Sequence, residues 1–228
     1  SFIELDRWWR MLAWGVYMTD CRWIEWYSNS VLDGLAERRI VIDNHSRVMR
    51  GEAIDALYDY VVTGGRLVLW SNSGQYTYGQ SEPRWELLTR LGYPDANTMG
   101  DTRRRGILRP VAGNGVLTSF DEMPMGDWAP LDKPEATVLA TIDGEPGAIA
   151  WDVGKGRVLL ISGEEVGPDL LSLAKLEPRK GRASAKQRKA YWPARASMRK
   201  SFIRTVQPLY RDLVGFATEL PEKVWHVE

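Results

Sequence analysis

Apolar and polar positions follow two alternating periods along the first half of the chain. The stretch 51–65, GEAIDALYDYVVTGG, places Ile54 and Leu57 at helical spacing and ends in a Gly-Gly pair typical of a left-handed helix cap. The apolar runs RRIVI (38–42) and RLVLW (66–70) flank this helix and predict buried strands, because central parallel strands are apolar on both faces. A strand, a helix and a strand in this order predict a parallel α/β unit.

The neighbouring segments continue this alternation and then depart from it. Residues 6–18 and 81–93 are predicted to be helices, the second one capped by Ser81, and residues 21–28 are predicted to be a strand. Residues 94–135 are rich in Gly, Pro, Asp and Arg, which predicts a long irregular excursion.

The second half of the chain begins with a hairpin pattern and ends in a basic segment. Residues 136–163 predict three strands joined by turns at Asp143-Gly144 and Gly154-Lys155-Gly156. A segment rich in Lys and Arg follows, and a helix is predicted over roughly 197–219. Within the basic segment, Arg188, Tyr191 and Trp192 are candidate interface residues, because an aromatic side chain among cations can anchor a partner. The alternative is a solvated charged face.

Composition excludes several function classes. The 228 residues carry 30 Lys or Arg and 30 Asp or Glu, and a formal net charge of zero argues against a dedicated nucleic-acid binder. No apolar run is long enough to span a membrane. The single cysteine, Cys21, rules out an intrachain disulfide and a Cys-rich zinc site. The two histidines, His45 and His226, lie at opposite ends of the chain, and no P-loop or G-x-G-x-x-G motif follows a predicted strand, so we expect neither a metal nor another cofactor.

Polar residues follow three predicted strands, where ligands bind in parallel α/β sheets. They allow a hydrolase set of Ser73 as nucleophile, His45 as base and Glu164 as orienting acid. However, the turn reads Trp70-Ser71-Asn72-Ser73-Gly74, and a nucleophile elbow wants small residues on both sides of the nucleophile. Polar side chains that bond the backbone of a tight turn are the favoured interpretation.

A carbohydrate-binding site is a third hypothesis. The chain contains 11 tryptophans, and the polar strand ends lie beside tyrosines. The candidate ligand-binding residues are Asn44, Asn72, Gln75, Tyr76 and Tyr78. Core and interface packing is the favoured role for most of the tryptophans.

The motifs Tyr60-Val61, Gly64-Gly65, Asp143-Gly144, Pro146 and GKGRV at 154–158 together resemble those of a known family. They resemble the class I glutamine-amidotransferase-like domain that serves as the trimerisation domain of bacterial beta-galactosidases and related glycoside hydrolases. The resemblance covers roughly residues 5–165. It departs from the family where a glutaminase needs a Cys nucleophile, since Asn72 and Ser73 stand there, and where it needs a His-x-Glu pair.

The resemblance implies an α/β fold, a flavodoxin-like three-layer sandwich with a mostly parallel sheet, an antiparallel hairpin extension and a C-terminal helical tail. Residues 1–165 would form the amidotransferase-like domain, and residues 166–228 a basic loop and helix packed on it. The implied role is a non-catalytic accessory or oligomerisation domain of a larger carbohydrate-active enzyme. Its partners would be further copies or other domains of the same polypeptide, with carbohydrate as a possible ligand. A bacterial cytoplasm and a periplasm both fit.

Overall fold

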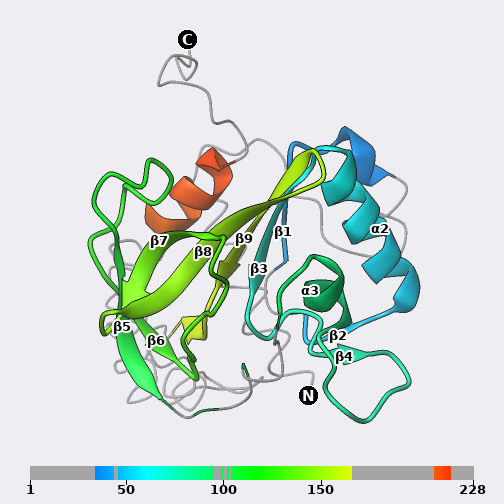
Figure 1. The fold of residues 1–228 in the computed structure, drawn as a ribbon, viewed down its shortest axis with the longest axis horizontal. Coiled ribbons are helices and arrows are strands. Elements are labelled where there is room, and N and C mark those ends of the chain that lie inside the picture. Colours follow the sequence, from blue (N-terminus) through cyan, green and yellow to red (C-terminus); the bar gives the residue numbers. More distant parts are fainter. Residues whose placement is uncertain are drawn as a thin grey trace, which may run out of the picture.

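A mixed eight-stranded sheet forms the centre of the fold (Figure 1). The structure is a computed structural model that describes residues 34–43, 46–94, 99, 102, 104–165 and 208–216. In spatial order the strands are β1 (Ile40–Ile42), β3 (Arg66–Trp70), β9 (Gly156–Ile161), β8 (Glu145–Val153), β7 (Thr137–Ile142), β5 (Arg105–Pro110), β6 (Met123–Gly126) and β10 (Glu164–Glu165). A separate two-stranded sheet pairs β2 (Val48–Met49) with β4 (Tyr76–Thr77). The helices are α2 (Gly51–Thr63), α3 (Glu86–Arg90) and a segment over 208–215.

Within the large sheet, parallel pairing is confined to β1, β3 and β9, and the small sheet of β2 and β4 is parallel as well. All other neighbouring strands of the large sheet run antiparallel. The mixed α/β class is confirmed, but the expectation of a mostly parallel sheet is wrong. The physical reason is the connections, because the short turns after β7 and β8 can join only antiparallel strands.

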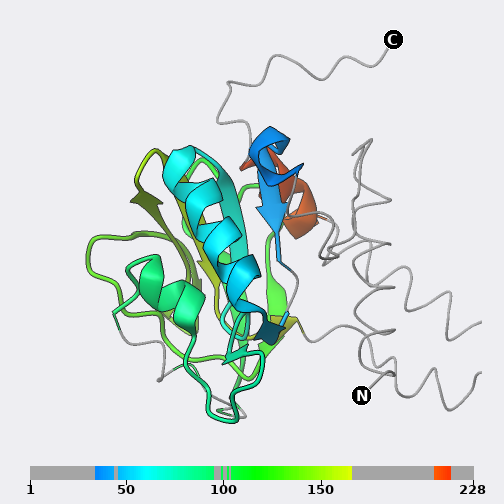
Figure 2. The same cartoon turned by 90° about the vertical axis from the view of Figure 1, so that its right-hand side faces the viewer.

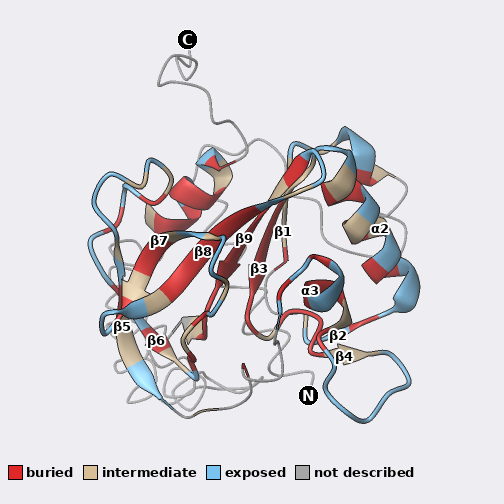
Figure 3. Ribbon diagram, in the orientation of Figure 1, coloured by how far each residue is buried: buried red, intermediate tan, exposed pale blue. Residues whose placement is uncertain are grey.

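Helical layers cover both faces of the sheet. Along β3, Leu67 and Leu69 face α2 and α3, whereas Val68 and Trp70 face the opposite core. That opposite core is closed by the helix over 208–215, which contributes Leu209, Tyr210 and Leu213, and by Phe216, which directly follows it. Figure 2 shows the two helical layers on either side of the strands, and Figure 3 shows that the strands between them are buried. The alternation of side chains along each strand therefore feeds two separate cores.

The sheet curls so that its far edge returns to the end of β9. Only Ser162 and Gly163 separate β9 from β10, yet β10 pairs with β6 at the other edge of the sheet. Gly163 has φ +82°, and a Cβ there would lie 2.5 Å from the Gly126 carbonyl oxygen. This corner therefore requires glycine both for its backbone conformation and for its space.

Two regions differ from the sequence-based expectation. The stretch 94–135 is not wholly irregular, because it contains β5 and β6, whose sequences RGILRP and MPMG carry Arg and Pro and mask their strand character. The helix expected over 81–93 is only α3, since Trp85 adopts a left-handed conformation (φ 44°) just before it. The Trp85 indole N–H donates to the Ser71 carbonyl at 2.7 Å, which fixes this residue to the β3 turn.

The glycine motifs bring two chain segments into contact. A Cβ at Gly65 would lie 2.3 Å from the Tyr60 ring, and one at Gly156 would lie 2.1 Å from the Val61 carbonyl oxygen. The close approach lets Lys155 N–H donate to Val62 O at 3.0 Å, which satisfies a carbonyl at the end of α2. The motifs behind the resemblance therefore have a packing role.

Several predicted elements lie outside the described residues. These are the helix over 6–18, the strand over 21–28, Cys21 and most of the basic segment. The boundary predicted at residue 165 stays a prediction.

Candidate functional site

The carboxyl ends of β1, β3 and β9 meet at one edge of the sheet, as the sequence predicts for parallel strands. There, Asn72 Nδ2 donates a hydrogen bond to Glu164 Oε1 at 2.8 Å. Both side chains are half-buried. The structure thus brings together two of the predicted site residues, which are 92 positions apart in the sequence. They bond to each other.

Ser73 is turned into the protein. It is fully buried, and its Oγ accepts a hydrogen bond from the Trp70 backbone N–H at 3.1 Å. Its own N–H donates to the Trp70 carbonyl at 2.8 Å. In this geometry the hydroxyl stabilises the turn and does not face solvent, where a substrate would have to reach it.

Ser71 joins the ends of β3 and β9. Its Oγ accepts a hydrogen bond from the Gly163 N–H at 2.9 Å, and its N–H donates to the Ile161 carbonyl at 2.8 Å. Sequence reasoning assigned it no role of its own, because nothing in a serine's sequence neighbours reveals a partner so far along the chain. Like Ser73, this serine satisfies buried backbone groups.

Because the sheet curls, the chain that follows β6 covers the carboxyl end of β9. The Ser162 hydroxyl accepts from the Ala129 N–H at 3.0 Å and also donates to the Ala129 carbonyl, and Glu164 pairs in register with Gly126 of β6. The segment that follows β6 therefore occupies the position beside β9 where a ligand would approach a flat parallel sheet.

The remaining ligand candidates fall into two environments. Gln75 is buried, and its Oε1 accepts two hydrogen bonds from the Arg47 guanidinium, at 2.9 Å from Nε and 2.7 Å from the terminal nitrogen. Tyr76 is half-buried in β4, and Tyr78 is 70% exposed under the Arg50 guanidinium. Five candidate residues lie outside the described residues: Asn44, His45, Arg188, Tyr191 and Trp192. The proposed contact of Ser73 with His45 therefore stays a prediction.

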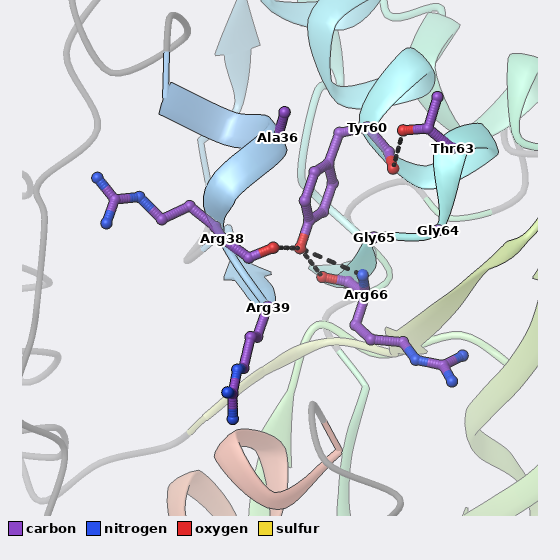
Figure 4. Close-up of a pocket in the computed structure, with 8 residues that line it drawn as sticks. All are labelled: Ala36, Arg38, Arg39, Tyr60, Thr63, Gly64, Gly65 and Arg66. Atoms are coloured by element: carbon purple, nitrogen blue, oxygen red, sulfur yellow. Dashed lines mark hydrogen bonds between the residues drawn. The ribbon is translucent and has the colours of Figure 1, made fainter.

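A hollow of about 430 Å³ lies at the opposite end of the parallel strands (Figure 4). Its lining residues are Ala36, Arg38, Arg39, Tyr60, Thr63, Gly64, Gly65 and Arg66. The three guanidinium groups point apart in Figure 4, and that of Arg66 lies 5.9 Å from the centre of the Phe216 ring. They do not converge on one small anion.

The Tyr60 hydroxyl stands at the floor of this hollow. It donates to one of two carbonyls, those of Arg38 and Arg66, each at 3.2 Å, and it accepts from the Arg66 N–H at 3.2 Å. Burial raises the pKa of Tyr60 to about 12, against the smaller opposing effects of the Arg66 backbone and charge. A neutral phenol that ties the segment before β1 to the start of β3 is a structural group.

The described part of the chain contains neither a candidate metal site nor a candidate membrane-spanning helix. No group of three or more His, Cys, Asp or Glu side chains is placed to hold a metal there. No helix in those ranges has the length and apolar character to cross a bilayer.

Comparison with known proteins gives partial structural likenesses. No family model and no curated protein matches the chain. Among solved structures, it is similar to Gan42B, a GH42 beta-galactosidase from G. stearothermophilus, with 18% identity and a TM-score of 0.42 over 57% of this chain and 20% of that one. It is also similar to a beta-galactosidase from Bacillus circulans sp. alkalophilus, with 19% identity and a TM-score of 0.39 over 55% of this chain and 20% of that one.

A third likeness covers more of both chains. It is to the cytoplasmic protein STM1381 from Salmonella typhimurium LT2, with 16% identity and a TM-score of 0.42 over 84% of this chain and 79% of that one. The chain spans about a fifth of the length of the two beta-galactosidases that it matches.

Proposed function

We propose that this chain is a non-catalytic accessory domain of a larger carbohydrate-active enzyme, with an amidotransferase-like scaffold that holds domains or subunits together. The proposal rests on the hydrogen bonds of the polar side chains at the carboxyl ends of β1, β3 and β9. Ser73 bonds the backbone of its own turn, Glu164 bonds Asn72, and the curl of the sheet covers the end of β9. Side chains that satisfy one another and the backbone are not free to act on a substrate.

The link to amidotransferase-like domains is supported by the position of the shared motifs. The Gly-Gly pair after α2 and the Gly-Lys-Gly turn before β9 lie in contact, and the contact leaves no room for a Cβ at Gly156. A packing role for these motifs supports the proposal of a common scaffold. The glutaminase chemistry of that scaffold would need a thiolate, and the turn has Asn72 and Ser73 in its place.

The test is an activity assay on the 228-residue chain with aryl glycosides, aryl esters and glutamine. We expect no turnover above buffer for any of the three, and no difference between the wild-type chain and Ser73→Ala. Hydrolysis that Ser73→Ala abolishes while the circular dichroism spectrum stays unchanged would establish the competing hydrolase function and overturn the proposal.

A further inference from the structure

The hollow at the amino ends of the parallel strands gathers positive charge. Three of its eight lining residues are arginines, Arg38, Arg39 and Arg66, and none of the eight is acidic. Ile40 pairs with Arg66 across β1 and β3, so Arg39, the residue before Ile40, lies beside the start of β3. Neighbouring strands are only about 5 Å apart. The three arginines therefore stand on adjacent stretches of backbone, and the lining supplies no carboxylate of its own.

The arrangement of these arginines suits carboxylates that are spaced along a chain. The three guanidinium groups point apart in Figure 4, so one small anion cannot contact all of them. The volume of about 430 Å³ lies within the range of ligand sites. Arg39 is exposed and forms no ion pair with any described residue. Because a guanidinium group binds a carboxylate through paired hydrogen bonds, an extended acidic segment is the occupant whose chemistry fits.

An acidic part of the chain starts beside this hollow. Phe216 directly follows the helix over 208–215, and the centre of its ring lies 5.9 Å from the Arg66 guanidinium. Figure 4 shows the same helix beside the lining residues, as the pale red ribbon below Arg39. Residues 217–228 lie outside the described residues, and their sequence, ATELPEKVWHVE, contains three Glu and one Lys. We call residues 217–228 the acidic segment.

We propose that the hollow is a docking site for the acidic segment of the same chain, with Glu219 on Arg66 and Glu222 on Arg39. Glu219 is three residues after Phe216 and Glu222 is six, and an extended chain covers these separations in roughly 10 and 20 Å. The Arg66 guanidinium lies next to the Phe216 ring, and Arg39 lies beside the start of the neighbouring strand. Both arginines are therefore within reach of the segment.

The covalent connection favours this segment over a free acidic peptide as the occupant. Exposed ion pairs are individually weak, so two of them hold a free peptide poorly. A segment attached a few residues away has an effective concentration on the order of millimolar, and weak contacts then suffice to hold it. The docked segment occupies the arginines and covers the Tyr60 hydroxyl at the floor of the hollow. It thereby closes the hollow to acidic peptides from other molecules.

The experiment is carbodiimide cross-linking of the 228-residue chain. Arg39→Lys keeps the positive charge and supplies an amine, which carbodiimide joins directly to a nearby carboxylate. We expect a cross-link within one chain from position 39 to Glu222 or Glu219, about tenfold more abundant than any from Arg105→Lys to the acidic segment. Raising the salt concentration should reduce the yield, since exposed charges are screened.

The chain offers both controls for this measurement. Arg105 is the matched negative control, because it is exposed on β5 and forms no ion pair with a described residue. Lys133 and Glu135 are the positive control, because Lys133 Nζ lies 3.3 Å from Glu135 Oε2 and the pair should be joined in every variant.

A charge exchange makes the test specific. Arg39→Glu should release the acidic segment and let chymotrypsin cleave after Trp225 about threefold faster, and Glu222→Arg should do the same. The two substitutions together should restore slow cleavage, because the charges in that contact are again opposite. Arg105→Glu should leave the cleavage rate unchanged. Circular dichroism and the melting temperature of each variant establish that it is folded.

Three results would overturn the inference: no cross-link from position 39 to the acidic segment while Lys133 and Glu135 are joined, an equal yield from Arg105→Lys, or a double variant that is cleaved as fast as Arg39→Glu. Cross-links that join only two separate chains would replace it, because the hollow would then hold a second copy. The inference goes beyond the proposed accessory role and does not depend on it. Failure of that role would appear as hydrolytic turnover, which none of these measurements involves.

Discussion

The two ends of the parallel strands differ in how they use polar and small residues. At the amino ends of β3 and β9, glycines allow backbone to approach backbone, and Gly156 lies against the end of α2. At the carboxyl ends, serines do the joining, with Ser71 bonding Gly163 and Ser73 bonding Trp70. The comparison teaches that a polar strand end, where a catalytic site is expected, can be as structural as a glycine junction.

Substitutions at the amino ends of the parallel strands, where the glycines lie, should reduce stability more than substitutions at the carboxyl ends, where the serines lie. Gly156→Ala would place a Cβ 2.1 Å from the Val61 carbonyl oxygen and 2.3 Å from that of Gly65, so the backbone of two elements must move. We expect the free energy of unfolding to fall by about 3 kcal/mol or more, as measured by urea denaturation. Gly51→Ala is the control, because a Cβ there meets nothing within 4 Å, and it should be neutral or slightly stabilising.

Substitutions in the helix over 208–215, which covers the second face of the sheet, should have the next largest effect on stability. Asp212 on the helix over 208–215 accepts hydrogen bonds from the backbone N–H groups of Thr118 and Ser119, both at 2.7 Å. Asp212→Ala leaves both donors without this acceptor and should cost about 2–3 kcal/mol in urea denaturation. Asp212→Asn keeps an acceptor oxygen and should cost less, and an equal loss in both variants would show that the bonds contribute little.

The effect of pH on the stability that Asp212 contributes has a definite sign. Burial raises the pKa of Asp212 above its usual value, against the opposing effects of its hydrogen bonds to Ser119 and Thr118. The folded state therefore favours the protonated acid, and stability falls as the pH rises from the ordinary pKa through the raised one. We expect the stability of Asp212→Asn relative to wild type to improve from pH 3 to pH 7, and a constant difference would contradict this account.

Tyr60 tests the glycine end at high pH. Its pKa is raised from 10.0 to about 12, so ionisation of the phenol opposes folding. The stability that the neutral Tyr60 side chain contributes is complete below pH 10 and is lost as the pH rises towards 12. Tyr60→Phe should be less stable by about 1 kcal/mol at pH 7, for the lost hydrogen bonds. Its alkaline loss between pH 10 and 12 should be smaller than that of wild type by about 2 kcal/mol, measured by thermal unfolding. Parallel alkaline curves would mean that Tyr60 does not titrate in this range.

The serine end should give the smallest effect. Ser73→Ala removes one acceptor of a buried N–H and should cost about 1 kcal/mol of stability, measured by denaturation. Ser73→Thr keeps the hydroxyl and serves as the control for its loss, although its added methyl group must be accommodated. A stable Ser73→Ala variant would remove the structural explanation and make the hydroxyl a stronger candidate for chemistry.

Local patterns predicted the elements that local forces form. The helix over 51–63, the strands at 40–42 and 66–70, and the three strands between 137 and 161 are confirmed, because side-chain periodicity and turn glycines are readable from neighbouring residues. The strands at 105–110 and 123–126 were missed. Their Arg and Pro residues are tolerated because each strand pairs with partners that no local window contains.

The same division holds for the candidate site. The sequence by itself determined that polar residues follow the strands, but it did not predict the hydrogen bond between Asn72 and Glu164, which the structure shows. It also determined that no cysteine stands on the β3 turn. Only the tertiary structure decided that Ser73 faces inward and that β10 returns to β6, because both depend on which distant backbone groups need a partner. Whether polar residues at a strand end form a functional site or a structural contact depends on what packs over them, and that packing is set by the whole chain.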